Sequence, residues 1–213
     1  EAACQQAGHF SSCSFGAHLN ITEFRPMSGS RQLQPILDDE GEFAGEERIR
    51  QVSIGTELAE GIFSEFCAQI QRLNSLGVAV THLDSHHHVH TIPRILPILK
   101  KVQKEFNLRK VRITRNIYAQ PQMISRSLAM KKTIYNFFLR HYYQTITTQG
   151  FADFRTFFEC GTTKGVRFNT VEVMVHPGSL VYGYQGETQI LRTPWEDAMG
   201  RPVRLISYKD LGG

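Results

Sequence analysis

The sequence has few of the features that mark disulfide-rich, membrane-spanning or nucleic-acid-binding proteins. Its four cysteines show no C-x-x-C spacing and are too few for a disulfide framework. A reducing, cytoplasmic location is therefore expected, although Cys4 and Cys13 could pair in an exported chain. No apolar run approaches the ~20 residues that a bilayer requires, so no membrane span is expected. The net charge is only +4 and the basic residues are scattered, so no nucleic-acid partner is expected either.

The chain also lacks an initiator methionine and a signal-like segment, and opens at Glu1. This beginning is typical of a fragment or a processed chain. With 213 residues, 41% of them hydrophobic and 21% charged, the sequence predicts one globular domain over residues 1–213.

Histidine is concentrated in one place. Residues 81–90 read T-H-L-D-S-H-H-H-V-H and hold five of the nine histidines. Imidazole is a common ligand of transition metals and titrates near neutral pH, so the segment predicts a metal and proton-transfer site. Neighbouring side chains of a loop diverge, so one or two ligands are expected here, with His82 and Asp84 orienting them. The alternative is a solvent-exposed polar loop.

The hydrophobic pattern predicts strands that alternate with helices, hence an α/β fold with a parallel sheet or barrel. Residues 15–21 alternate as a strand that places His18 on the polar face, and residues 25–55 are predicted to form a long surface loop. A helix follows with Thr56 as its N-cap and an apolar stripe of Leu58, Ile62, Phe66, Ile70 and Leu73. Further strands are expected at 78–84, 110–114, 170–176 and 203–208, and further helices at 93–106, 123–149 and 184–198.

Polar residues gather just after the predicted strand ends: His18, the histidine segment, Arg115 and His176. Active sites of such folds are assembled at the carboxyl ends of strands, so these residues are predicted to share one site. Each also has a simpler interpretation. His18 could be a structural histidine, His176 could bond a loop, and Arg112 and Arg115 could form surface salt bridges.

Three segments resemble signature segments of the YdjC-like carbohydrate deacetylases, a family that includes the chito-oligosaccharide deacetylases. They are G-A-H-L-N-I-T at 16–22, T-H-L-D-S-H-H-H-V-H at 81–90 and E-V-M-V-H-P-G at 172–178, and the likeness covers essentially the whole chain. The resemblance implies an irregular (β/α) barrel of the polysaccharide-deacetylase type. It also implies a divalent metal ion, Mg or Zn, held by Asp, His and His, with His18 and His86 as the histidines. The family's aspartate lies in an A-D-D-F-G segment that this sequence does not contain, which implies that the first strand is missing.

The implied activity is metal-dependent removal of N-acetyl groups from amino-sugar oligosaccharides. We expect His176 to protonate the leaving amine, and His82, Asp84, His88 and Arg115 to support the metal or the substrate. Two alternatives stay open: a deacylase of another N-acyl glycan, and a non-catalytic carbohydrate-binding or scaffolding protein that lost its first strand. An unpaired strand edge would also favour a homodimer.

Overall fold

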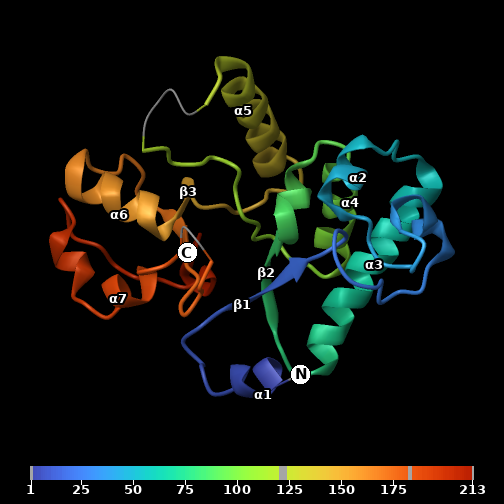
Figure 1. The fold of residues 1–213 in the computed structure, drawn as a ribbon, viewed down its shortest axis with the longest axis horizontal. Coiled ribbons are helices and arrows are strands. Elements are labelled where there is room, and N and C mark those ends of the chain that lie inside the picture. Colours follow the sequence, from blue (N-terminus) through green and yellow to red (C-terminus); the bar gives the residue numbers. More distant parts are fainter. Residues whose placement is uncertain (1, 120–123, 182–183, 213) are drawn as a thin grey trace. The chain divides into compact units, whose positions relative to one another are not determined.

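A computed structural model describes residues 2–119, 124–181 and 184–212, and the chain divides into two compact units (Figure 1). Unit 1 consists of Glu1–Val111, Phe138–Ile146 and Ser207–Gly213. Unit 2 consists of Arg112–Phe137 and Thr147–Ile206.

The sheet of unit 1 pairs β1 (Phe15–Leu19) with β2 (Val80–Ser85) in parallel. Ala17 and Leu19 are buried and His18 between them is exposed, which confirms the predicted alternation. Beyond β2, single bridges join Leu83 to Val111 and Lys110 to Ile146. The strand expected at 110–114 is therefore reduced to these two bridges.

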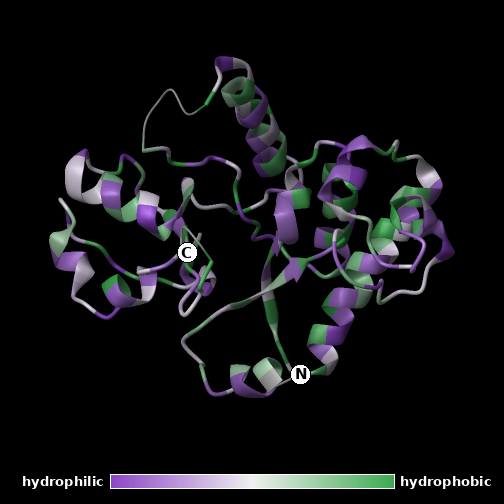
Figure 2. Cartoon of the chain, in the orientation of Figure 1, coloured by the Kyte–Doolittle hydropathy of each residue, from purple (hydrophilic) through white to green (hydrophobic). Residues whose placement is uncertain are grey.

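Two helices cover this sheet region. The apolar stripe of α3 (Thr56–Ser75) is buried at Leu58, Ile62, Phe66 and Ile70, as predicted, and α3 packs against β1 and α4 (Leu96–Glu105). Each helix therefore carries one apolar and one polar side (Figure 2). The N-cap of α3 is Gly55 rather than the expected Thr56, which is the first helical residue.

The long surface loop predicted at 25–55 is wrong in part, because short helices form within it. They are η1 (Arg31–Ile36) and α2 (Gly45–Gln51), and α1 (Ala2–Ala7) precedes β1. Ser30 caps η1 by accepting a hydrogen bond from the Gln32 N–H, and Leu33, Ile36 and Ile49 are buried. Burial of these few apolar side chains folds a segment whose composition is typical of a loop.

Unit 2 contains a second parallel pair, β3 (Gly150–Asp153) with β4 (Val171–Met174), joined through α6 (Phe154–Thr163). The strand prediction at 170–176 is confirmed, whereas β3 and α6 were not predicted. Asp153 caps α6 through the Thr156 N–H, and Phe154, Phe157, Cys160 and Trp195 form the local core.

Three predictions for the last third of the chain need correction. The helix expected at 123–149 is α5 (Arg126–His141), and the start of that expected range lies outside the described residues. The helix expected at 184–198 divides into α7 (Glu187–Leu191) and η4 (Trp195–Ala198) before and after Pro194, which lacks a backbone N–H. The strand expected at 203–208 is irregular and leads into η5 (Tyr208–Asp210).

The fold is thus mixed α/β with parallel strand pairs, as predicted, and the described residues form two two-stranded sheets without a closed barrel. No helix among them is both long and apolar enough to cross a membrane. All four cysteines are free thiols.

Candidate functional site

The first element of the site is a histidine–carboxylate pair between adjacent strands. His18 on β1 lies directly opposite Asp84 on β2, and His18 Nδ1 is 2.8 Å from Asp84 Oδ2. The Asp84 side chain is 10% exposed and that of His18 is 52% exposed. A carboxylate that accepts from Nδ1–H leaves Nε2 as the unprotonated ring atom of a neutral His18, which is the usual arrangement of a metal-ligating histidine.

The histidine segment follows β2 as a short 3₁₀ helix, η2 (His86–Thr91). His87 and His88 both have a positive φ, of 47° and 53°, which is uncommon for residues other than glycine. Buried His90 anchors the segment to the end of β2. Its Nδ1 and its backbone nitrogen both lie within 3.0 Å of Ser85 Oγ. His88 is exposed, and its ring centroid lies 6.3 Å from that of His90.

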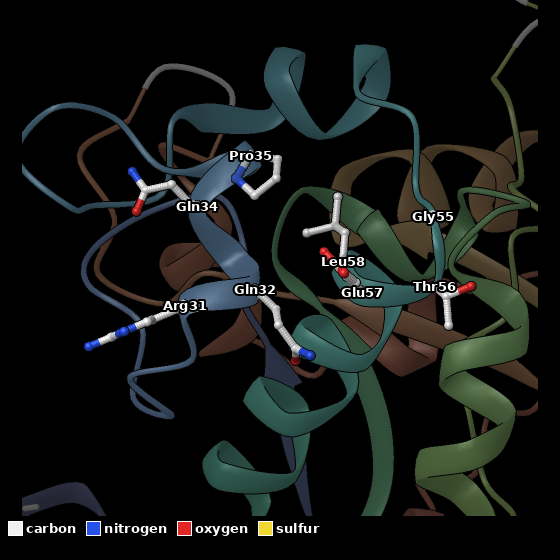
Figure 3. Close-up of a pocket in the computed structure, with 8 residues that line it drawn as sticks. All are labelled: Arg31, Gln32, Gln34, Pro35, Gly55, Thr56, Glu57 and Leu58. Carbon is white, nitrogen blue, oxygen red and sulfur yellow. The ribbon is translucent and has the colours of Figure 1, made fainter.

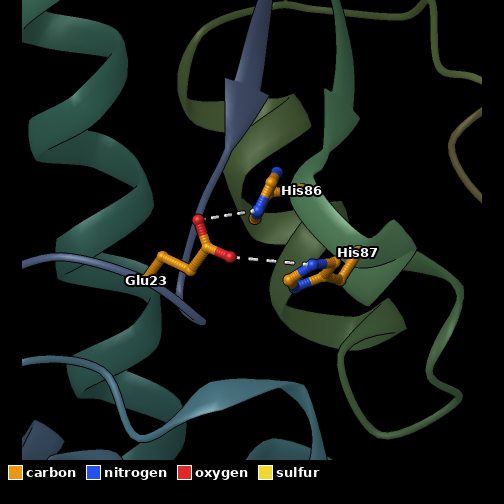
Figure 4. Close-up of side chains that lie close together, drawn as sticks. All are labelled: Glu23, His86 and His87. Atoms are coloured by element: carbon orange, nitrogen blue, oxygen red, sulfur yellow. Dashed lines mark ion pairs between the residues drawn. The ribbon is translucent and has the colours of Figure 1, made fainter. Parts of the chain in front are cut away.

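These turns bring His86 and His87 close to the carboxylate of Glu23, which was not among the predicted site residues (Figure 4). His86 Nε2 lies 3.1 Å from Glu23 Oε2, and His87 Nε2 lies 3.8 Å from Glu23 Oε1. One ligand atom from each of Glu23, His86 and His87 lies within 4.8 Å of the others. The ring centroids of His18 and His86 are 5.6 Å apart, so the His18–Asp84 pair adjoins the same cluster.

The donor atoms suit a divalent cation. His86 Nε2 is buried and makes no hydrogen bond to any described residue, although Glu23 Oε2 is 3.1 Å away. A buried imidazole nitrogen without a hydrogen bond is costly, and a metal ion between it and the carboxylate would satisfy it. Two imidazoles and a carboxylate form a mixed N/O set that accepts Zn and related divalent ions.

Thr22 contacts one ring nitrogen of His87. The Thr22 hydroxyl donates its single hydrogen to Asn20 Oδ1, over 3.1 Å. His87 Nδ1 lies 3.0 Å from the same oxygen, so with the hydroxyl hydrogen on Asn20 the donor of that contact is Nδ1. In the neutral imidazole, Nε2 then carries a lone pair toward Glu23. Two electron-rich groups that face one another require a proton or a cation between them.

His82, the other predicted site residue on β2, has different surroundings. The His82 ring is stacked on Tyr208, with centroids 3.9 Å apart and planes at 9°, and His82 Nδ1 lies 2.9 Å from Thr81 Oγ1. The ring also occupies the space that a side chain at Gly16 would take. His82 thus packs between β1 and η5, and it lies two residues before Asp84 on β2.

Two predicted site residues belong to unit 2. His176 follows β4, and its N–H donates to Glu187 Oε2 over 2.8 Å while its ring lies 4.0 Å from that of Tyr184. The Arg115 guanidinium lies over the Phe168 ring at 4.7 Å. Arg112, the other arginine of this segment, forms an ion pair of 2.8 Å with Glu172, and both side chains are 12% exposed.

A separate hollow of about 550 Å³ lies where α3 begins (Figure 3). Its lining contains Arg31, Gln32, Gln34, Pro35, Gly55, Thr56, Glu57 and Leu58, and so includes neither Glu23 nor a histidine. A neighbouring hollow of about 310 Å³ contains Arg94 and Lys101. The first is formed by the segment that was expected to be a loop and by the start of α3, and the second lies between the start of α3 and α4.

Sequence reasoning selected His18, His86 and Asp84 but missed Glu23. The available signal was its position, directly after the G-A-H-L-N-I-T segment and four residues beyond the end of β1. An acidic residue just after a strand that bears a histidine can reach the same edge of a parallel sheet.

Carbohydrate deacetylases are among the known proteins to which this chain is similar. A carbohydrate deacetylase of Vibrio cholerae is 35% identical over 106 residues, which are 50% of this chain and 40% of that protein. One of Clostridium beijerinckii is 32% identical over 108 residues, 51% of this chain and 42% of that protein. The matched stretch thus spans less than half the length of these curated relatives.

A solved structure shares the fold. It is described as a cellobiose-phosphate cleavage protein of Enterococcus faecalis V583, and it superimposes with a TM-score of 0.73 at 20% sequence identity, covering 98% of this chain and 82% of that one. The profile of YdjC-like proteins matches residues 1–197, which is most of the sequence. The chain therefore belongs to the family of YdjC-like proteins.

Proposed function

We propose that this chain forms part of a metal-dependent carbohydrate deacetylase, which hydrolyses the N-acetyl amide of amino-sugar oligosaccharides. The observation that carries the proposal is the buried His86 Nε2, without a hydrogen bond and directed at Glu23 beside the His18–Asp84 pair. Support comes from membership of the YdjC-like family and from relatives named carbohydrate deacetylases. An irregular (β/α) barrel is part of the same proposal.

In this proposal His18, His86, His87 and Glu23 supply the ligands of a divalent ion, Mg or Zn. A bound ion would polarise the amide carbonyl and lower the pKa of a water molecule, which for zinc falls to about 7. Asp84 holds the imidazole of His18 through Nδ1 and so keeps Nε2 available. His176 is the proposed proton donor to the leaving amine, a role typically worth ~10²–10⁴-fold in rate.

Acetate release from N-acetylglucosamine oligomers tests the activity. We expect the full-length protein to release acetate with Zn²⁺ or Mg²⁺ added and to stop after chelation. His86→Ala should abolish release, whereas His9→Ala, which alters an exposed histidine before β1, should not change it.

One alternative function is distinguished by the same assay. A carbohydrate-binding protein without catalysis would bind the oligomer, in a titration calorimeter, yet release no acetate under any metal condition. Release from another N-acylated glycan alone would retain the chemistry and change the substrate.

A further inference from the structure

The turn that carries Glu23 is organised by one side chain, Asn20. Its Oδ1 accepts hydrogen bonds from the Thr22 N–H over 2.9 Å, the Thr22 hydroxyl over 3.1 Å and the Glu23 N–H over 3.2 Å. Its Nδ2 donates to the Glu23 carbonyl over 2.9 Å. The amide of Asn20 therefore binds both backbone polar groups of Glu23, which fixes the point of the chain from which its side chain extends.

Asn20 is itself fixed by helix α3. The Asn20 N–H donates to Gln69 Oε1 over 2.9 Å, and Gln69 Nε2 donates back to the Asn20 carbonyl over 2.6 Å. Gln69 Nε2 also reaches Glu65 Oε1 over 2.8 Å. This two-point contact ties the end of β1 to the side of α3 on which Leu58, Ile62 and Glu65 are buried.

The other end of the same turn is tied to the same helix. Glu65 is fully buried, and its carboxylate accepts hydrogen bonds from the Met27 N–H over 3.0 Å and the Ser28 N–H over 2.8 Å. Both attachments come from neighbouring turns of α3. The segment from Asn20 to Ser28 is thus a clamped loop with Glu23 inside it.

The clamp reaches the histidines as well. Asn20 takes the hydroxyl hydrogen of Thr22, so Thr22 can only accept from His87 Nδ1. Thr22 is 1% exposed, so water does not supply an alternative donor or acceptor. The amide of Asn20 thereby acts on two of the groups that face the proposed metal. It sets the position of Glu23, and it sets the tautomer of His87.

We propose that Asn20, anchored by Gln69 and acting through Thr22, is the positioning residue of the metal centre. It holds Glu23 opposite the imidazoles and keeps His87 in the tautomer whose unprotonated Nε2 can bind a cation. The inference rests on the proposed function for the presence of a metal, and it adds that metal affinity depends on an amide that does not itself contact the ion.

A merely structural clamp would stabilise the loop and leave the metal centre unchanged. Metal-loaded spectra separate the two roles, because the d–d absorption of Co²⁺ reports its ligands. Loss of outer contacts of this kind typically lowers metal affinity by roughly 10–100-fold. We therefore expect Gln69→Met and Asn20→Ala each to weaken Co²⁺ binding about tenfold or more and to alter the spectrum.

Matched controls lie on the same helix. Gln71→Met and Asn74→Ala change the same residue types at exposed positions of α3 and should leave both Co²⁺ affinity and spectrum unchanged. Thr22→Val should reproduce the loss, and Thr22→Ser, which keeps the hydroxyl, should restore it. Normal Co²⁺ affinity and spectrum in folded Gln69→Met and Thr22→Val protein would overturn the proposal.

A measurement on the unaltered protein covers the case in which variants fail to fold. Two-bond ¹H–¹⁵N correlation NMR of the metal-free protein should show His87 protonated at Nδ1. Protonation of neutral His87 at Nε2 alone would overturn the proposal. If the protein binds Co²⁺ as expected, with the variants weakened, yet releases no acetate, the deacetylase function fails and the positioning role stands. If it binds no divalent ion, both fail.

Discussion

Asp84 Oδ2 lies 2.8 Å from His18 Nδ1 across the parallel pair of β1 and β2. The register of the two strands creates this contact, because residues 18 and 84 are direct partners with side chains on the same face. Asp84 is nearly buried whereas His18 is half exposed, so the carboxylate is the fixed member and the imidazole the one it orients.

Replacing Asp84 with Asn should therefore weaken metal binding. The amide preserves the volume of the side chain but removes its charge, and it can present a donor to Nδ1 and so favour the other tautomer of His18. We expect the affinity for Zn²⁺ to fall roughly 10–100-fold, measured by isothermal titration calorimetry.

Asp39→Asn is the control for that experiment, since it makes the same exchange at an exposed position. Equal affinities of Asp84→Asn and the unaltered protein would show that the carboxylate does not prepare His18 for a metal.

How much of this site follows from the sequence depends on the range of the interactions. The strand of His18 and the helical stripe of α3 were predictable, because periodicity records which face is buried. The placement of His18, His86 and Asp84 at strand ends was predictable for the same reason. Their chemical roles came from the resemblance of three segments to a known family.

Glu23 was not predictable in this way, because its position depends on Asn20 and, through it, on Gln69, which lies 49 residues beyond Asn20. The short helices η1 and α2 were missed because a few buried side chains outweigh a loop-like composition. The strand expected at 203–208 failed for the opposite reason: a local apolar pattern without a neighbouring strand to pair with among the described residues.

Gly16 is expected to be essential for the packing of His82. A Cβ at position 16 would overlap the His82 ring, which is also stacked on Tyr208. Gly16→Ala should lower the free energy of unfolding by about 1–3 kcal/mol, the usual cost of overpacking, in urea denaturation. Gly8→Ala serves as the comparison, since a Cβ there meets nothing within 4 Å. Similar stabilities of the two variants would contradict the predicted overlap.

Phe24 follows Glu23 with φ at 66° and is 71% exposed, so its backbone is strained without compensating burial. Asn accepts this conformation more readily than Phe, and β-branched Val less readily. We expect thermal denaturation to rank Phe24→Asn as the most stable and Phe24→Val as the least, with steps on the order of 1 kcal/mol. A reversed order would show that the turn adopts another conformation in solution.

Lys100 is a buried lysine in unit 1. It is 1% exposed and donates hydrogen bonds to Gln103 Oε1 over 2.8 Å, to the Leu139 carbonyl over 2.7 Å and to Thr145 Oγ1. Desolvation by burial lowers the pKa of Lys100 from its ordinary 10.5 to about 8.

The lowered pKa of Lys100 predicts a specific pH dependence of stability. Between about pH 8 and 10.5 the unfolded chain retains the Lys100 proton that the folded chain has lost. The contribution of Lys100 to the free energy of unfolding therefore increases as pH rises. The slope is at most about 1.4 kcal/mol per pH unit for one proton. Lys100→Met should remove this component, seen as a difference from the unaltered protein that grows from pH 8 to 10.5 in urea denaturation. Lys131→Met, at an exposed position of α5, should show a constant difference. A constant difference for Lys100→Met as well would mean that the buried amine keeps its ordinary pKa.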